Sequence, residues 1–141
     1  MSTSSLGWDV HAMVGCFDGV IPPVLATVSA AGEPNVTHLS QLHLVDERHL
    51  AVSNQFFGKT SANLAENPYA CVLVTDSQDF STYRIDLRFE RSDTAGPLFE
   101  QMRTSIDAIG ALMRMEDVFV LRSADVYEIL DVQLISGPAP D

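Results

Sequence analysis

Residues 53–60, SNQFFGKT, include the side chains of this chain that are best suited to binding a phosphate. The final GKT matches the end of the motif GxxxxGK[ST], whose backbone and lysine hold the phosphates of a nucleoside triphosphate. The first glycine of that motif is replaced here by Ser53. Phe56 and Phe57 would also crowd a loop that wraps around phosphates. The segment is therefore not predicted to be a triphosphate site.

A simpler phosphate site is compatible with the same turn. Gly58 stands where a β-rich run ends and the helix-forming run 59–66 begins. The first N–H groups of a helix have no partners within the helix, and the helix dipole adds partial positive charge there. Lys59 is the only lysine in the chain, and Thr60 and Ser61 add hydroxyl groups. We predict that this turn holds one phosphate monoester, with a helix cap by Thr60 or Ser61 as the alternative.

The histidines do not form a predicted metal site. The chain has four, His11, His38, His43 and His49. His38 and His43 are five positions apart in the sequence, and we expect them to face opposite sides of one strand. A joint metal site is therefore not expected.

The cysteines and the acidic pair in 76–79 have no evident catalytic arrangement. Cys16 and Cys71 are the only cysteines, and neither belongs to a CxxC or CxxH pattern. That argues against structural zinc and fits free thiols in a reducing cytosol. Asp76 and Asp79 fall in a predicted turn and are expected to be solvated.

Mostly β-strands must position these residues. Periodicity and turn signals predict helices over 8–18, 59–66 and 94–113, strands over 24–29, 35–45, 49–54, 69–76 and 81–91, and two strands or one bent strand over 118–135. Short turns join most consecutive strands, which favours an antiparallel sheet of six or more strands closed into a small barrel, with helices outside it. The predicted class is α+β, mainly β, with one domain over 1–136 and a tail or linker over 137–141.

Composition and charge exclude several classes of protein. The 141 residues include 46% hydrophobic and 19% charged residues, which is typical of a globular domain. A net charge of −11, from 8 basic and 19 acidic residues, argues against binding to nucleic acid. No apolar run approaches the ~20 residues needed to span a membrane, and no signal peptide is evident, so a cytoplasmic protein is expected.

Two long stretches resemble the pyridoxamine 5′-phosphate oxidase-like family of FMN-binding split barrels. They are LATVSAAGEPNVTHLS (25–40) and HLAVSNQFFGKTSANLAENPYACVLV (49–74), and the resemblance extends over roughly residues 12–130. A third stretch, TYRIDLRFERSDTAGPLFEQM (82–102), resembles the subset of the family in which the barrel precedes a sensory module.

The resemblance implies a homodimer that holds FMN at the subunit interface. By position, Lys59 and Thr60 would hold the phosphate, and Asn63 would face the same turn. The remaining cofactor contacts implied in this way are Ser53, Asn54 and Gln55 for the ribityl chain and ring edge, Thr37, His38, Leu39 and Ser40 for the isoalloxazine ring, and Arg84 or Arg88 of the partner subunit.

The activity implied is that of an FMN-dependent oxidoreductase that transfers hydride between a small substrate and the flavin. Oxidases of vitamin B6 use an arginine in their C-terminal segment for the substrate, but DVQLISGPAPD contains neither arginine nor lysine. Pyridoxamine phosphate is therefore not the expected substrate. Two alternatives remain open: a flavin-binding or ligand-binding sensory module without turnover, and a split barrel that uses F420 or haem.

Overall fold

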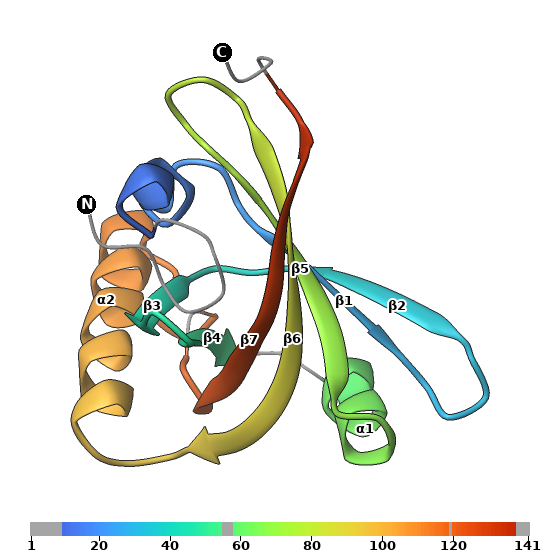
Figure 1. Ribbon diagram of the computed structural model, residues 1–141. Helices are drawn as coiled ribbons and strands as arrows, with labels where there is room; N and C mark the ends of the chain where they lie inside the picture. Colours follow the sequence, from blue (N-terminus) through green and yellow to red (C-terminus); the bar gives the residue numbers. More distant parts are fainter. Residues whose placement is uncertain (1–9, 55–57, 119, 138–141) are drawn as a thin grey trace.

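The computed structural model describes residues 10–54, 58–118 and 120–137, which form one antiparallel sheet, two α-helices and a 3₁₀ helix (Figure 1). The elements in chain order are η1 (Val10–Cys16), β1 (Val24–Val28), β2 (Pro34–His38), β3 (Leu42–Asp46), β4 (His49–Asn54), α1 (Gly58–Glu66), β5 (Tyr69–Thr75), β6 (Thr82–Asp93), α2 (Pro97–Met113) and β7 (Ser123–Ser136). None of the described helices is long and apolar enough to cross a membrane.

The sheet curls into a split barrel. Its seven strands follow the order β2-β1-β5-β6-β7-β4-β3, so β2 and β3 lie at opposite edges although only residues 39–41 separate them in the chain. The two edges must therefore approach each other. Side chains from six strands fill one buried core inside the curl, among them Leu25, Leu50, Val72, Ile85 and Tyr127. The predicted mainly β fold with peripheral helices is confirmed.

The predicted single strand over 35–45 is wrong. It is two strands, because residues 39–41 leave the ladder to carry the chain from one sheet edge to the other. Leu39 is buried, and its N–H donates to the carbonyl of Pro23 at 3.0 Å. His38 and His43 consequently lie on different strands, and the expectation that they face opposite sides of one strand is also wrong.

The predicted amphipathic helix over 8–18 is, in its described part, a 3₁₀ helix over Val10–Cys16, and residues 8 and 9 lie outside the described residues. Its backbone is kinked at Met13, and Gly15 packs against Asp76. A Cβ at position 15 would lie 2.6 Å from Asp76 Oδ1, so the close approach needs glycine. Asp76 is 8% exposed, which corrects the prediction of a solvated carboxylate.

The second α-helix begins at residue 97 rather than at the predicted residue 94 and ends at the predicted residue 113. Gly96 has a φ of 97°, which is not helical, and Pro97 begins α2. The buried side chains are Phe99, Met102 and Ile106, whereas Leu112 is 86% exposed. The last predicted segment, 118–135, is a single strand, β7, that begins at Ser123.

Candidate functional site

Helix α1 is held against the β1–β2 hairpin by buried polar side chains. Asn35 on β2 donates to Thr60 Oγ1 at 3.0 Å, and Asn63 donates to Thr27 Oγ1 on β1 at 3.2 Å. Thr60 and Asn63 are only 2% and 3% exposed. Asn63 therefore points to β1, and Thr60 already accepts one hydrogen bond from β2.

The N-terminal end of α1 carries an accessible cation. The Lys59 side chain is 58% exposed, and its Nζ lies 3.9 Å from Glu33 Oε2 in the hairpin turn. Outside its own helix and its chain neighbours, no atom of the described residues lies within 4 Å of a Cβ built on Gly58. An anion placed here would meet helix N–H groups and one ammonium group, in competition with one carboxylate.

The side chains of Ser53 and Asn54 are used within the fold. Ser53 is 2% exposed, and its N–H and Oγ donate to the carbonyl of Gln41 at 3.1 and 3.3 Å. Asn54 donates to Asp125 Oδ2 at 3.2 Å. Gln55, the third residue predicted to follow the ribityl chain, lies outside the described residues, as do Phe56 and Phe57.

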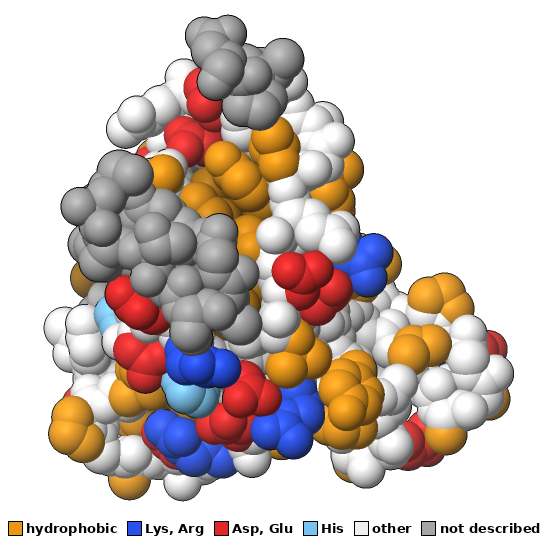
Figure 2. Space-filling model, in the orientation of Figure 1, with side chains coloured by type: hydrophobic (Ala, Val, Ile, Leu, Met, Phe, Trp, Pro, Cys, Tyr) orange, Lys and Arg blue, Asp and Glu red, His pale blue; other side chains and the backbone are white. Residues whose placement is uncertain are grey.

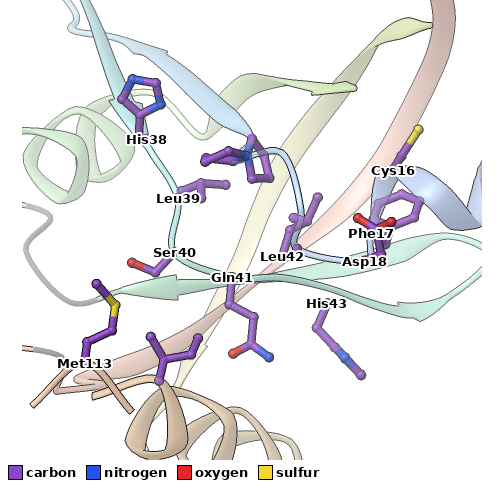
Figure 3. Close-up of a pocket in the computed structure, with 14 residues that line it drawn as sticks. Cys16, Phe17, Asp18, His38, Leu39, Ser40, Gln41, Leu42, His43 and Met113 are labelled. Carbon is purple, nitrogen blue, oxygen red and sulfur yellow. The ribbon is translucent and has the colours of Figure 1, made fainter. Parts of the chain in front are cut away.

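A cavity of about 840 Å³ lies beside the crossing from β2 to β3 (Figure 3). Three parts of the chain form its walls: the end of η1 with the segment that follows, residues 38–43, and the last turns of α2. The lining residues are Cys16, Phe17, Asp18, Gly19, Pro22, Pro23, His38, Leu39, Ser40, Gln41, Leu42, His43, Ile109 and Met113.

This cavity brings together most of the residues predicted to contact a flavin ring. His38, Leu39 and Ser40 line it, and so does His43 from the next strand. Thr37 is not among the lining residues, and its hydroxyl lies 3.4 Å from the carbonyl of His38. The break between β2 and β3 is what places both histidines at the lining of one cavity, which the sequence pattern did not reveal.

Two further lining residues were missed by sequence analysis. Gln41 Oε1 is buried and has no hydrogen-bonding partner in the part of the chain that the structure describes. Burial, reinforced by nearby acidic groups led by Asp76, raises the pKa of the Cys16 thiol to about 12. The Cys16 thiol therefore stays protonated and forms part of the cavity wall rather than acting as a nucleophile. No local motif marks Gln41, because its environment is created by the edge-to-edge crossing.

The arginines predicted to come from a partner subunit lie on the outer face of β6. Arg84 Nε is 2.8 Å from Asp86 Oδ1 on the same strand, whereas Arg88 pairs across the strands with Glu128 at 3.0 Å. Charged groups of both signs mix in the lower part of Figure 2, without a separate basic patch in that view. Within the described residues no group of three or more potential ligands is arranged to hold a metal ion.

Comparison with known proteins identifies the family. A family model described as pyridoxamine 5′-phosphate oxidase matches residues 15–130. The chain belongs to this family. No curated protein sequence matches it significantly.

Solved structures with the same fold include proteins with different cofactors in their names. An FMN-binding protein from Syntrophomonas wolfei subsp. wolfei is 20% identical with a TM-score of 0.74, over 91% of this chain and 88% of that chain. An F420 reductase is 15% identical with a TM-score of 0.59, over 84% and 93%. HutZ, the haem storage protein from Vibrio cholerae, is 15% identical with a TM-score of 0.56, over 80% and 84%. At these identities the family member shares their fold, and its cofactor must be argued from its own residues.

Proposed function

We propose that this family member binds FMN, with the phosphate at the start of α1 and the isoalloxazine ring at residues 38–40. One observation carries the proposal: β2 connects the two places. Asn35 of β2 bonds to Thr60 at the start of α1, and His38 of the same strand lines the cavity. Three residues of strand span about 10 Å at ~3.3 Å each. The extended ribityl chain of FMN bridges such a separation.

The phosphate would be held chiefly by the helix start and by Lys59. The Thr60 side chain accepts from Asn35, so it would contribute its hydroxyl proton or its backbone N–H rather than a lone pair. The Glu33 carboxylate lies 3.9 Å from the Lys59 ammonium group, and the phosphate would have to replace it as the partner of that group. The residues present thus fit one phosphate group, and they do so with a single cationic side chain.

A homodimer would complete the site. Several large apolar side chains on the outer face of the sheet are exposed: Val36 by 64%, Tyr69 by 56%, Leu73 by 38% and Leu130 by 39%. Strand register places them on the face that also carries Arg84 and Arg88. Exposed apolar surface of this extent is typical of an interaction site, and a second copy seated there would bring its arginines toward the flavin.

The proposed reaction is hydride transfer between a small molecule in the cavity and the flavin. When bound, FMN supplies the redox chemistry. The chain itself supplies position and exclusion of water: the cavity walls are largely apolar, and the Cys16 thiol stays protonated. Flavin-dependent oxidoreductase activity is accordingly the function that these residues support best.

Two measurements test the proposal. Purified protein with bound flavin should absorb near ~450 nm. Lys59→Ala should weaken FMN binding about 10- to 100-fold, which corresponds to one charge-assisted contact, and should leave riboflavin binding almost unchanged. Arg114→Ala, which removes an exposed cation at the far end of α2, is the matched control. Equal losses for FMN and riboflavin would refute the phosphate assignment, and a monomer that binds FMN tightly would refute the interface.

Haem is the second candidate, and one observation favours it. His38 and His43 line the same cavity, and imidazole is a common axial ligand of haem iron. A haem complex should absorb near ~400 nm, and His38→Ala or His43→Ala should change that band. A spectrum with the flavin band alone, unchanged by either substitution, would remove this candidate.

A further inference from the structure

Gln41 lines the cavity, and its side-chain oxygen has no hydrogen-bonding partner among the described residues. Gln41 Oε1 is buried and accepts no hydrogen bond from the described residues. In Figure 3 the side chain leaves the start of β3 and points toward α2. Buried polar groups in proteins are almost always paired. The site therefore lacks one donor, which a bound molecule can supply.

The backbone of Gln41 is fixed, so the side chain is presented in a defined place. Gln41 N–H donates to Ser53 Oγ at 3.1 Å, and its carbonyl accepts from Ser53 N–H at 3.1 Å and Ser53 Oγ at 3.3 Å. Ser53 is itself buried. Such preorganisation reduces the ordering cost of binding. Ser53 thus fixes the backbone from which the Gln41 side chain extends.

The walls around Gln41 suit a ring compound. Over the cavity as a whole, apolar surface comes from Phe17 just after η1, from Leu42 of β3, and from Ile109 and Met113 of α2. The volume of about 840 Å³ lies within the range of sites for small organic ligands.

The charge of the walls disfavours anions. None of the described lining residues is lysine or arginine, and Asp18 lies among them. The Asp18 carboxylate accepts a hydrogen bond from Ser77 Oγ and another from Val20 N–H at 3.0 Å. These bonds, that of Ser77 first, lower the pKa of Asp18, so the carboxylate stays ionised. An anionic ligand would meet this charge without a compensating cation.

We propose that the part of the cavity around Gln41 binds a second small molecule, an uncharged ring compound without a phosphate that donates one N–H or O–H hydrogen bond to Gln41 Oε1. The inference rests on the proposed function only for the placement of the flavin, which would border this molecule at residues 38–40. Binding of the second molecule is tested with and without FMN.

The test uses benzyl alcohol, benzyl methyl ether and benzyl phosphate, which share a ring and differ in donor and charge. Binding to the full chain is followed by ligand-observed nuclear magnetic resonance. The alcohol should bind about two- to tenfold more tightly than the ether, the ratio expected for one neutral hydrogen bond. Benzyl phosphate should not bind measurably.

Two pairs of variants locate the binding. Gln41→Leu should bring the alcohol-to-ether ratio to about one, whereas Gln101→Leu, exposed on α2, should leave it unchanged. Ile109→Phe fills the cavity and should weaken both probes. Leu112→Phe, on the same turn but 86% exposed, should not.

The outcomes separate this inference from the proposed function. Equal affinity for alcohol and ether, binding of the phosphate, or complete displacement of the alcohol by FMN would overturn the second site. Failure to bind FMN, together with an intact alcohol preference, would refute the proposed function and leave the Gln41 site standing.

Discussion

The two α-helices of this protein are attached to the same sheet by different interactions. Helix α1 buries Thr60, Asn63 and a single apolar side chain, Leu64. Helix α2 buries Phe99, Met102, Ile106 and Gly110, and the first three of these share a hydrophobic cluster with Ala51, Leu121, Ala124 and Val126. Helix α1 is also tied to the hairpin turn, because Ala30 N–H donates to Glu66 Oε2 at 2.9 Å.

The difference corresponds to different roles. Hydrogen bonds are directional, so the contacts of α1 fix its rotation and hold its open N-terminal end in one place, as a phosphate site requires. Apolar packing is not directional, and it lets α2 cover the sheet with its middle turns while Ile109 and Met113 form a cavity wall.

The largest expected effect is a loss of unfolding free energy when the apolar packing of α2 is removed. Ile106 is fully buried under α2, so Ile106→Ala should reduce the free energy of unfolding by about 2–5 kcal/mol. Leu112→Ala, on the exposed side of the same helix, should change it by less than about 0.5 kcal/mol. Urea unfolding of both variants measures the difference. A cost for Ile106→Ala no greater than that of Leu112→Ala would show that α2 is not held by this packing.

The next effect tests whether α1 depends on its polar contacts. Asn63→Ala leaves the buried Thr27 hydroxyl without its donor and should cost about 1–3 kcal/mol of unfolding free energy. FMN binding should weaken with it, because the helix start is no longer fixed. Ser61→Ala, exposed on the same helix, is the control. If both variants unfold at the same urea concentration, the bond from Asn63 to Thr27 does not help to hold α1.

A smaller effect concerns the carboxylate beside the proposed phosphate site. Glu33→Gln removes the negative charge 3.9 Å from Lys59 Nζ and should strengthen FMN binding about two- to fivefold at low salt. The gain should shrink as ionic strength rises. Glu66→Gln makes the same change of charge at the opposite end of α1. Equal gains for the two variants would indicate a general charge effect rather than competition at Lys59.

The smallest effect lies away from both helices, in the β3–β4 turn. His49 Nδ1 is 2.9 Å from Asp46 Oδ1, and Nε2 is 3.4 Å from Glu90 Oε1. The hydrogen bond to Asp46 raises the pKa of His49, against an opposing contribution from partial burial and with further support from the charges of Asp46 and Glu90. The pKa of His49 in the folded state therefore lies above its unfolded value of about 6.5. Below pH 6.5 the ion pairs of His49 contribute their full stabilisation of the fold, and this contribution is lost as the pH rises through the raised pKa.

His49→Gln should accordingly lower the free energy of unfolding by less than about 1 kcal/mol near pH 5.5, and the electrostatic part of that loss should vanish near pH 9. Urea midpoints at several pH values measure it, with His38→Gln on exposed β2 as the control. A loss that is the same at both pH values would show that packing, rather than the ion pairs, accounts for it.

The sequence by itself determined the antiparallel, mainly β fold, the hairpin of β1 and β2, and the short helix that begins at the GKT turn. These features depend on local periodicity and turn residues, such as Gly32 with its φ of 86°, and local chemistry is enough to select them. The exposed position of Lys59 at a helix start follows from the same local signals.

Only the tertiary structure decided what surrounds those residues. Residues 35–45 have continuous strand character, yet the curled sheet must be closed between its edges, and that requirement breaks the strand at 39–41. The break places His38 and His43 on one cavity and leaves the oxygen of Gln41 buried without a donor. Ser53, which sequence reasoning assigned to a ligand, is used to hold that crossing. Closure of a sheet is a property of all seven strands together, and no local pattern encodes it.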